Sequence, residues 1–151
     1  MRKILILFLP AYIVITMSIN TIVEAVPKPP EGSRGELYQD LFVTILLPYI
    51  EQPINEYYSK IINVTPMVYP YQVDIVSAKR VLEGRSFLFI VTLEVTPVVG
   101  PHISVGKDRL TFKIGAPDEI GQSVKLIHFN HLETHELPPD LKHILRKQQS
   151  L

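Results

Sequence analysis

The sequence contains no cysteine, and this absence excludes several kinds of chemistry at once. A chain without thiols forms no disulfide, holds no thiolate zinc site and offers no cysteine nucleophile or lipid-modified cysteine. Small secreted eukaryotic domains commonly depend on disulfides, so the absence favours a bacterial source.

The sequence also lacks an excess of charge of either sign. Fifteen basic and fifteen acidic residues are interspersed along 151 residues. No basic stripe is present to attract phosphates, so we expect no nucleic-acid partner. We also find no recognisable catalytic or cofactor motif, and we expect neither a cofactor nor, on balance, an enzyme.

The N-terminus has the layout of a signal peptide. Arg2 and Lys3 precede an apolar run over 4–15, and small residues lead up to Ala25. This order of basic, apolar and small residues is typical of a secretory signal. We expect residues 1–25 to be cleaved after Ala25 and the protein to be secreted, with membrane contact only before cleavage.

An uncleaved membrane anchor is the alternative. A spanning helix needs about 20 apolar residues. Asn20 and Glu24 stop this run short of that length. We therefore favour secretion over tethering at the membrane.

The remaining 126 residues divide into a linker and one domain. Residues 26–35 contain three prolines and two glycines and are predicted to be a linker, followed by a domain over 36–151. Ser33 and Glu36 have the spacing of a capping box, which predicts the start of a helix.

A helix is predicted over about 36–61, kinked or broken at Pro48 and Pro53, because proline lacks an amide and crowds the preceding turn. Its apolar residues recur at helical spacing and are expected to pack on a sheet. They are Leu37, Leu41, Ile45 and Tyr49, with Phe42, Leu46 and Ile50 widening the stripe and Ile54, Tyr57, Tyr58 and Ile61 continuing it.

From Pro66 onward the apolar period changes from helical to two. Strands are predicted over about 71–82, 87–95, 109–114 and 122–129, with a loop over 98–107. The apolar parity switches between Ile75 and Val76, which predicts a β-bulge in the first strand. A short helix is expected to begin at Pro138–Pro139.

This order of elements predicts an α+β fold. A long kinked N-terminal helix packs on a four-stranded antiparallel meander, and a short C-terminal helix follows. The arrangement resembles cystatin-like and NTF2-like folds, in which a curved sheet grips a helix. This likeness of fold implies little about function.

Several stretches together resemble a known family. They are Asp40-Leu41-Phe42, Leu46-Leu47-Pro48-Tyr49-Ile50, Tyr57-Tyr58, Arg85-Ser86-Phe87-Leu88-Phe89, Val99-Gly100-Pro101-His102, Val105-Gly106, Asp108, Thr111-Phe112 and Glu136-Leu137-Pro138-Pro139. The chain resembles a family of small exported proteins from spore-forming Gram-positive bacteria, known only as a domain of unknown function. The resemblance implies an extracytoplasmic protein and assigns no activity and no functional residues.

Two sets of residues are candidates for chemistry. His102 and Asp108 lie in one glycine-containing loop, where such a pair can orient a general base or simply hold turn amides. His128, His131 and His135 are candidate metal ligands, although His128 and His131 would point to opposite faces of a strand. Solvated surface histidines are the alternative, and we favour it over a metal site.

Tyrosines gather near the end of the helix and the first strand, and Tyr57 and Tyr58 are the candidates for binding. Tyrosine supplies apolar area and a hydroxyl, which suits carbohydrate or peptide. We therefore expect a non-enzymatic extracytoplasmic module that binds a cell-envelope component or another exported protein. The alternative is a small secreted hydrolase or metal-binding protein that uses His102 and Asp108 or the three histidines.

Overall fold

The structure is a computed structural model that describes residues 26–118 and 121–146. The predicted signal peptide lies outside these residues. Within them, no helix is long and apolar enough to cross a membrane.

The long helix α1 runs from Arg34 to Tyr58. Its start follows the predicted cap, because the Ser33 hydroxyl accepts a hydrogen bond from the Glu36 amide at 3.1 Å. The Glu36 carboxylate reaches back to the Gly32 amide. The helix includes both Pro48 and Pro53 within its bounds, and the kink at these residues stays a prediction.

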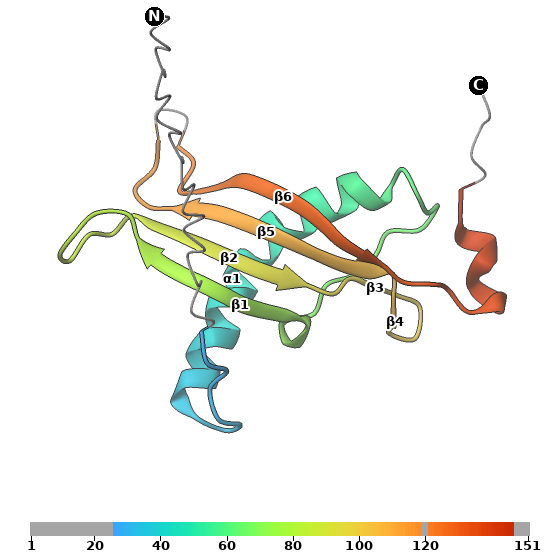
Figure 1. Cartoon of the computed structure of the whole chain (residues 1–151), viewed down its shortest axis with the longest axis horizontal. Helices are drawn as coiled ribbons and strands as arrows, with labels where there is room; N and C mark the ends of the chain where they lie inside the picture. Colours follow the sequence, from blue (N-terminus) through green and yellow to red (C-terminus); the bar gives the residue numbers. More distant parts are fainter. Residues whose placement is uncertain (1–25, 119–120, 147–151) are drawn as a thin grey trace, which may run out of the picture.

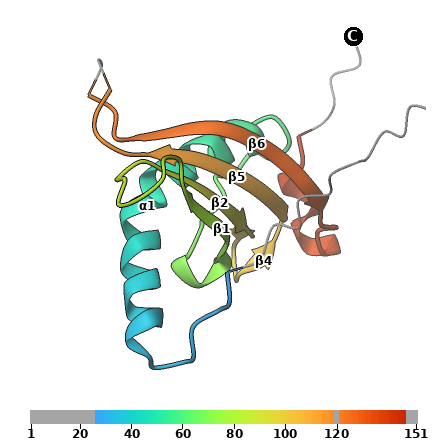
Figure 2. The ribbon, with the colours of Figure 1, turned by 60° about the vertical axis from the view of Figure 1, so that its left-hand side comes forward.

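Four antiparallel strands form one sheet in the order β1 (Val73–Arg80), β2 (Phe89–Val95), β5 (Gly106–Ile114) and β6 (Val124–Thr134). α1 lies behind this sheet, and its first turns extend beyond edge strand β1 (Figures 1 and 2). The predicted α+β fold with a four-stranded antiparallel sheet is therefore confirmed. β6 continues beyond the predicted residue 129, because its last residues pair with the start of β5.

Bulges interrupt the ladder in both edge strands. The register of β1 shifts between Ile75 and Ser77, which confirms the bulge that the parity switch predicted. In β6 the pairing passes over Ile127 and Leu132. Each bulge adds an unpaired residue and increases the local twist.

The predicted loop after β2 contains a small hairpin of β3 (Val98–Val99) and β4 (Ile103–Ser104). Its turn places Gly100 at φ 49° and His102 at φ 64°. Two short 3₁₀ helices complete the fold: η1 (Pro70–Gln72) precedes β1, and η2 (Pro139–Ile144) replaces the short C-terminal helix that was expected.

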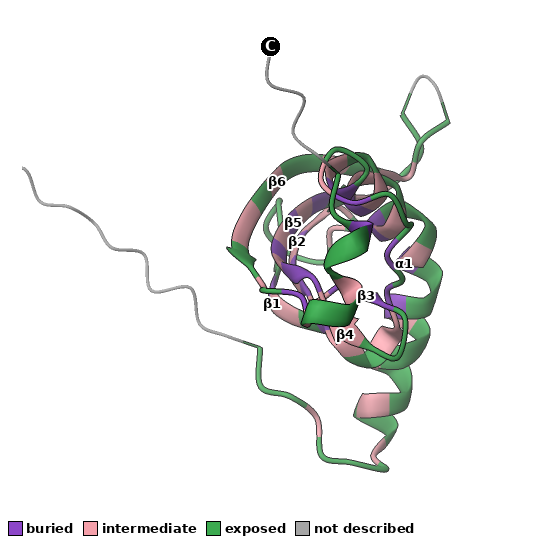
Figure 3. Ribbon diagram, turned by 90° about the vertical axis from the view of Figure 1, so that its right-hand side faces the viewer, coloured by how far each residue is buried: buried purple, intermediate pink, exposed green. Residues whose placement is uncertain are grey.

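The core lies between α1 and the sheet (Figure 3). The prediction of the helix face was wrong in part. Leu46, Ile50, Ile54 and Tyr58 are buried as expected, and Val43, which was not expected, packs beside them on the sheet. The four expected leading residues, Leu37, Leu41, Ile45 and Tyr49, are exposed.

The reason is that α1 carries two apolar stripes. Spacing alone does not fix the rotation of a helix about its axis. The stripe that faces the sheet is the one that continues to the end of the helix, where Tyr58 reaches the start of β5. Among the residues that the structure describes, those of the core cluster lie between Val43 and Ile144.

Candidate functional site

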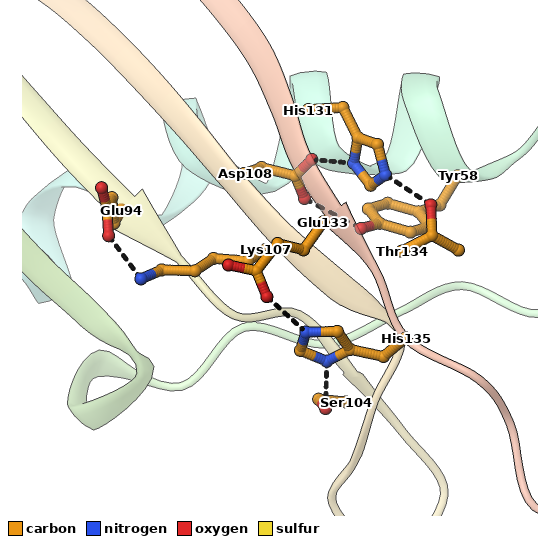
Figure 4. Close-up of polar contacts among 9 residues, drawn as sticks. All are labelled: Tyr58, Glu94, Ser104, Lys107, Asp108, His131, Glu133, Thr134 and His135. Carbon is orange, nitrogen blue, oxygen red and sulfur yellow. Dashed lines mark hydrogen bonds and ion pairs between the residues drawn. The ribbon is translucent and has the colours of Figure 1, made fainter.

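A buried carboxylate lies where the end of α1 meets β5 and β6. Asp108, near the start of β5, has no exposed surface. One of its oxygens accepts a hydrogen bond from the Tyr58 hydroxyl at 3.0 Å, and the other lies 2.7 Å from Nδ1 of His131 on β6 (Figure 4). Nε2 of His131 lies 2.7 Å from the Thr134 hydroxyl. We call these four residues the Asp108 cluster.

Gly106 allows the parts of this cluster to meet. A Cβ atom at Gly106 would lie 2.3 Å from the Tyr58 hydroxyl oxygen and 2.5 Å from the Glu133 carbonyl oxygen. Real Cβ atoms do not approach other atoms so closely, so the position requires glycine. The Tyr57 ring stacks on the imidazole of His131, with ring centroids 4.7 Å apart, and helps to hold it in place.

Burial controls the protonation of the cluster. Burial raises the pKa of the Asp108 carboxyl, against the lowering effect of the hydrogen bonds from His131 and Tyr58. Burial and the nearby Asp108 also raise the pKa of Tyr58, so its hydroxyl stays a donor. An ionised Asp108 only accepts hydrogen bonds, so the proton between the two groups lies on Nδ1 of His131 in that state.

This assignment makes Nε2 of His131 an acceptor for the Thr134 hydroxyl. The order of carboxylate, imidazole and hydroxyl is the one in which a general base activates a nucleophile. Thr134 is exposed, whereas Asp108 is buried. The same contacts also join the end of α1 to β5 and β6, so they have a structural role in either case.

A second histidine lies beside the cluster. Nδ1 of His135 lies 2.7 Å from the Ser104 hydroxyl, and Nε2 lies 3.4 Å from the Glu133 carboxylate. These contacts tie the end of β6 to the β3–β4 hairpin (Figure 4).

A stack of aromatic rings lies on the surface near η1 and the β3–β4 turn. Tyr69 stacks on Tyr71, with centroids 5.5 Å apart, and on His102, at 4.9 Å. The Tyr71 hydroxyl lies 3.0 Å from Nδ1 of His102. Tyr71 and His102 are exposed, and we call these three residues the aromatic platform.

The backbone of His102, which has a positive φ, orients the imidazole of this platform. Residues other than glycine adopt the left-handed region at a cost, although histidine does so more often than most. Here the strained backbone presents the imidazole to Tyr69 and Tyr71.

A small hollow adjoins the platform. Its volume is about 130 Å³, and it lies between Tyr71 and the first turns of α1. Glu36, Asp40 and Lys28 contribute charged groups to its lining.

The structure brings together some of the predicted site residues and separates others. Asp108 contacts Tyr58 and His131, whereas His102 contacts Tyr71, so the two residues of the proposed loop pair belong to different clusters. Tyr57 packs on His131.

The three candidate metal ligands also have separate surroundings. His128 is exposed and pairs with Thr111, whereas His131 and His135 have the contacts given above. In the described part of the chain, no group of three or more histidines, aspartates or glutamates is arranged to hold a metal ion.

Sequence reasoning missed Thr134 and the stacking of Tyr69 on His102. Thr134 follows His131 by three residues, a spacing without a recognised motif. Tyr71 and His102 are 31 residues apart, and only the fold of the intervening strands brings them together.

A family model matches residues 38–133, and its description is "Protein of unknown function (DUF3888)". No curated protein and no solved structure matches the chain. The likeness to cystatin-like or NTF2-like folds therefore stays a prediction.

Proposed function

Because the chain belongs to this family of proteins of unknown function, we propose a function from its own residues. The protein is an exported bacterial binding module that contacts a glycan of the cell envelope and catalyses no reaction. The aromatic platform is the observation that supports this proposal.

The platform has the properties of a glycan-binding surface. Sugar rings present C–H groups that pack on the flat faces of aromatic side chains, and aromatic rings with polar edges suit such ligands. Tyr71 is 64% exposed although it is held by a stacking contact and a hydrogen bond. An exposed ring fixed in one orientation loses little conformational entropy when a ligand binds.

The adjoining hollow supplies polar partners. The Glu36 and Asp40 carboxylates accept hydrogen bonds from hydroxyl groups, and Lys28 donates them. A few polar groups beside an aromatic surface are the usual composition of a small-ligand site. A peptide is the other class of ligand for such a surface, and the experiment below distinguishes it.

The experiment uses protein recovered from the culture medium of an expressing host. A mass that begins at Val26 supports export with cleavage after Ala25, whereas retention with the membrane fraction supports the tethered alternative. The chain has no tryptophan, so its fluorescence comes from its tyrosines, two of which, Tyr69 and Tyr71, belong to the platform.

Chitotetraose, a soluble N-acetylglucosamine tetramer, is the probe. We expect it to change the tyrosine emission, and we expect Tyr71→Ala to weaken binding by about tenfold or more. Tyr38→Ala is the matched control, because Tyr38 is also 64% exposed but lies on the outer side of α1. Binding of unrelated peptides without binding of this glycan or of cell-wall polysaccharide would overturn the assignment.

The Asp108 cluster favours a second candidate, an esterase with Thr134 as nucleophile. In this mechanism the Thr134 oxygen attacks the ester carbonyl and its proton passes to Nε2 of His131. The leaving alcohol takes up that proton, and water then hydrolyses the acyl-threonine. Asp108 holds the imidazole in the required tautomer.

Hydrolysis of p-nitrophenyl acetate tests this candidate. If the cluster is catalytic, Thr134→Val lowers the turnover rate by about 10²-fold or more. Thr65→Val, a change at an exposed loop residue, leaves the rate unchanged. Equal rates for both variants and the wild type would leave the cluster with a structural role alone.

A further inference from the structure

Helix α1 is apolar on two opposite sides. The inner side is buried on the sheet, whereas the outer side carries large apolar residues open to solvent. The exposed fractions are 55% for Leu37, 64% for Tyr38, 51% for Leu41, 70% for Ile45 and 41% for Tyr49. We call these five residues the outer stripe. The side of α1 turned away from the sheet is largely green in Figure 3.

An apolar surface of this kind marks a contact with another molecule. Isolated exposed apolar residues are common, but a contiguous row along one helix is not. A helix that is apolar all round is normally buried on all sides. The outer stripe therefore indicates that a further element covers α1.

The charges at the two ends of the stripe identify that element. Arg34 lies at the start of α1 and Glu56 lies near its end, and neither forms an ion pair with any residue that the structure describes. At 100° per residue, Arg34, Ile45 and Glu56 fall within a sector of about 40° of the helix surface. At the end of this sector, Tyr49 and Glu56 also border a hollow beside β6. A cation, an apolar centre and an anion thus follow one another along the same line.

This order of cation, apolar centre and anion is complementary to the same order on a second, antiparallel helix. If two helices pack antiparallel about a twofold axis at Ile45, Arg34 of each chain faces Glu56 of the other. Leu41 then faces Tyr49, and Ile45 faces its own copy. We propose that a second copy of this chain covers the outer stripe, forming an antiparallel α1–α1 dimer. An interface of this type uses the same surface patch on both subunits.

The charge of α1 argues against a lipid surface as the partner. Arg34 is its one basic residue, whereas Glu36, Asp40, Glu51 and Glu56 are acidic. Anionic lipids attract basic segments and repel acidic ones. The dimer is independent of the proposed glycan platform, which lies beside η1.

The size of the contact suggests a weak dimer. The segment from Arg34 to Glu56 is about 33 Å long. Two such helices in contact bury an area near the lower limit of specific interfaces, so we expect a Kd on the order of 10 µM.

Sedimentation velocity of the chain that begins at Val26, over about 1–300 µM, measures this equilibrium. We expect a concentration-dependent monomer–dimer transition. Ile45→Asp should raise the Kd by about 10²-fold or more, because it places two buried carboxylates on the axis. Leu82→Asp is the matched control, since Leu82 is 61% exposed in the turn after β1, and it should leave the Kd unchanged.

A charge exchange tests the orientation of the two helices. Arg34→Glu and Glu56→Arg should each raise the Kd by about threefold or more, and the double variant should restore it, because the exchange re-creates both pairs. Circular dichroism confirms that each variant is folded. A wild-type chain that stays monomeric at every concentration overturns the dimer. A dimer that Ile45→Asp leaves intact, or a double variant that is not restored, overturns the antiparallel α1 interface.

Discussion

Asp108 is the residue on which the junction of α1, β5 and β6 depends. A buried carboxylate is costly unless it is paired and hydrogen-bonded. Here Tyr58 and His131 each serve one oxygen, from two different elements. Loss of either donor leaves an oxygen of a buried group without its partner.

Tyr58→Phe removes one of these donors and keeps the ring. We expect it to lower the free energy of unfolding by about 1–3 kcal/mol, the cost of a buried acceptor left without a donor. Urea denaturation followed by circular dichroism measures the change.

Tyr57→Phe serves as its control. The Tyr57 ring stacks on His131, but its hydroxyl forms no hydrogen bond with the described residues. If Tyr58→Phe and Tyr57→Phe unfolded at the same urea concentration, the hydroxyl of Tyr58 would contribute nothing to the stability of the junction.

Between elements, a charged network joins β2 to β5 on the face of the sheet opposite α1. Glu94 on β2 lies 2.5 Å from both Lys107 and Arg109 on β5. Hydrogen bonds from Lys107 and Arg109 lower the pKa of the Glu94 carboxyl below its ordinary value. The network therefore stabilises the folded state above the ordinary glutamate pKa and is lost as the pH falls through the lowered value.

Glu94→Gln should remove this pH dependence. We expect the variant to be less stable than the wild type by about 1 kcal/mol near neutral pH, and the difference to shrink as the pH falls. Glu136→Gln is the control, because the Glu136 pair with Lys142 is exposed and should contribute little. A wild-type advantage over Glu94→Gln that stays constant down to pH ~2 would contradict the assigned role.

The contribution of Asp108 to stability changes with pH in the opposite direction to that of Glu94. Burial raises its pKa in the folded state, so its own contribution to stability decreases as the pH rises through that raised value. Comparison with Glu94→Gln at each pH cancels this effect, because both proteins contain Asp108.

Across the whole molecule, local periodicity predicted the elements, and three-dimensional proximity decided the site. The change of period near Pro66 and the parity switch at Ile75 are local signals, and the strands and the bulge in β1 follow them. Tyr58 and Asp108 are 50 residues apart, and no local signal relates them.

The buried face of α1 also could not be predicted from local sequence signals. Both stripes of α1 have helical spacing, and hydrophobicity alone gives no reason to prefer Leu46 over Ile45. The choice is made by contacts with strands that lie far along the chain. Sequence therefore indicated that α1 packs on the sheet without indicating which side does so.

The bulges of β6 have a consequence for how the protein behaves at high concentration. An edge strand of 11 residues offers a row of free amides and carbonyls to any other extended chain. The unpaired Ile127 and Leu132 interrupt that row and twist the edge. No long flat segment of β6 is left to act as a template, so this edge of the sheet is a poor site for strand-by-strand aggregation.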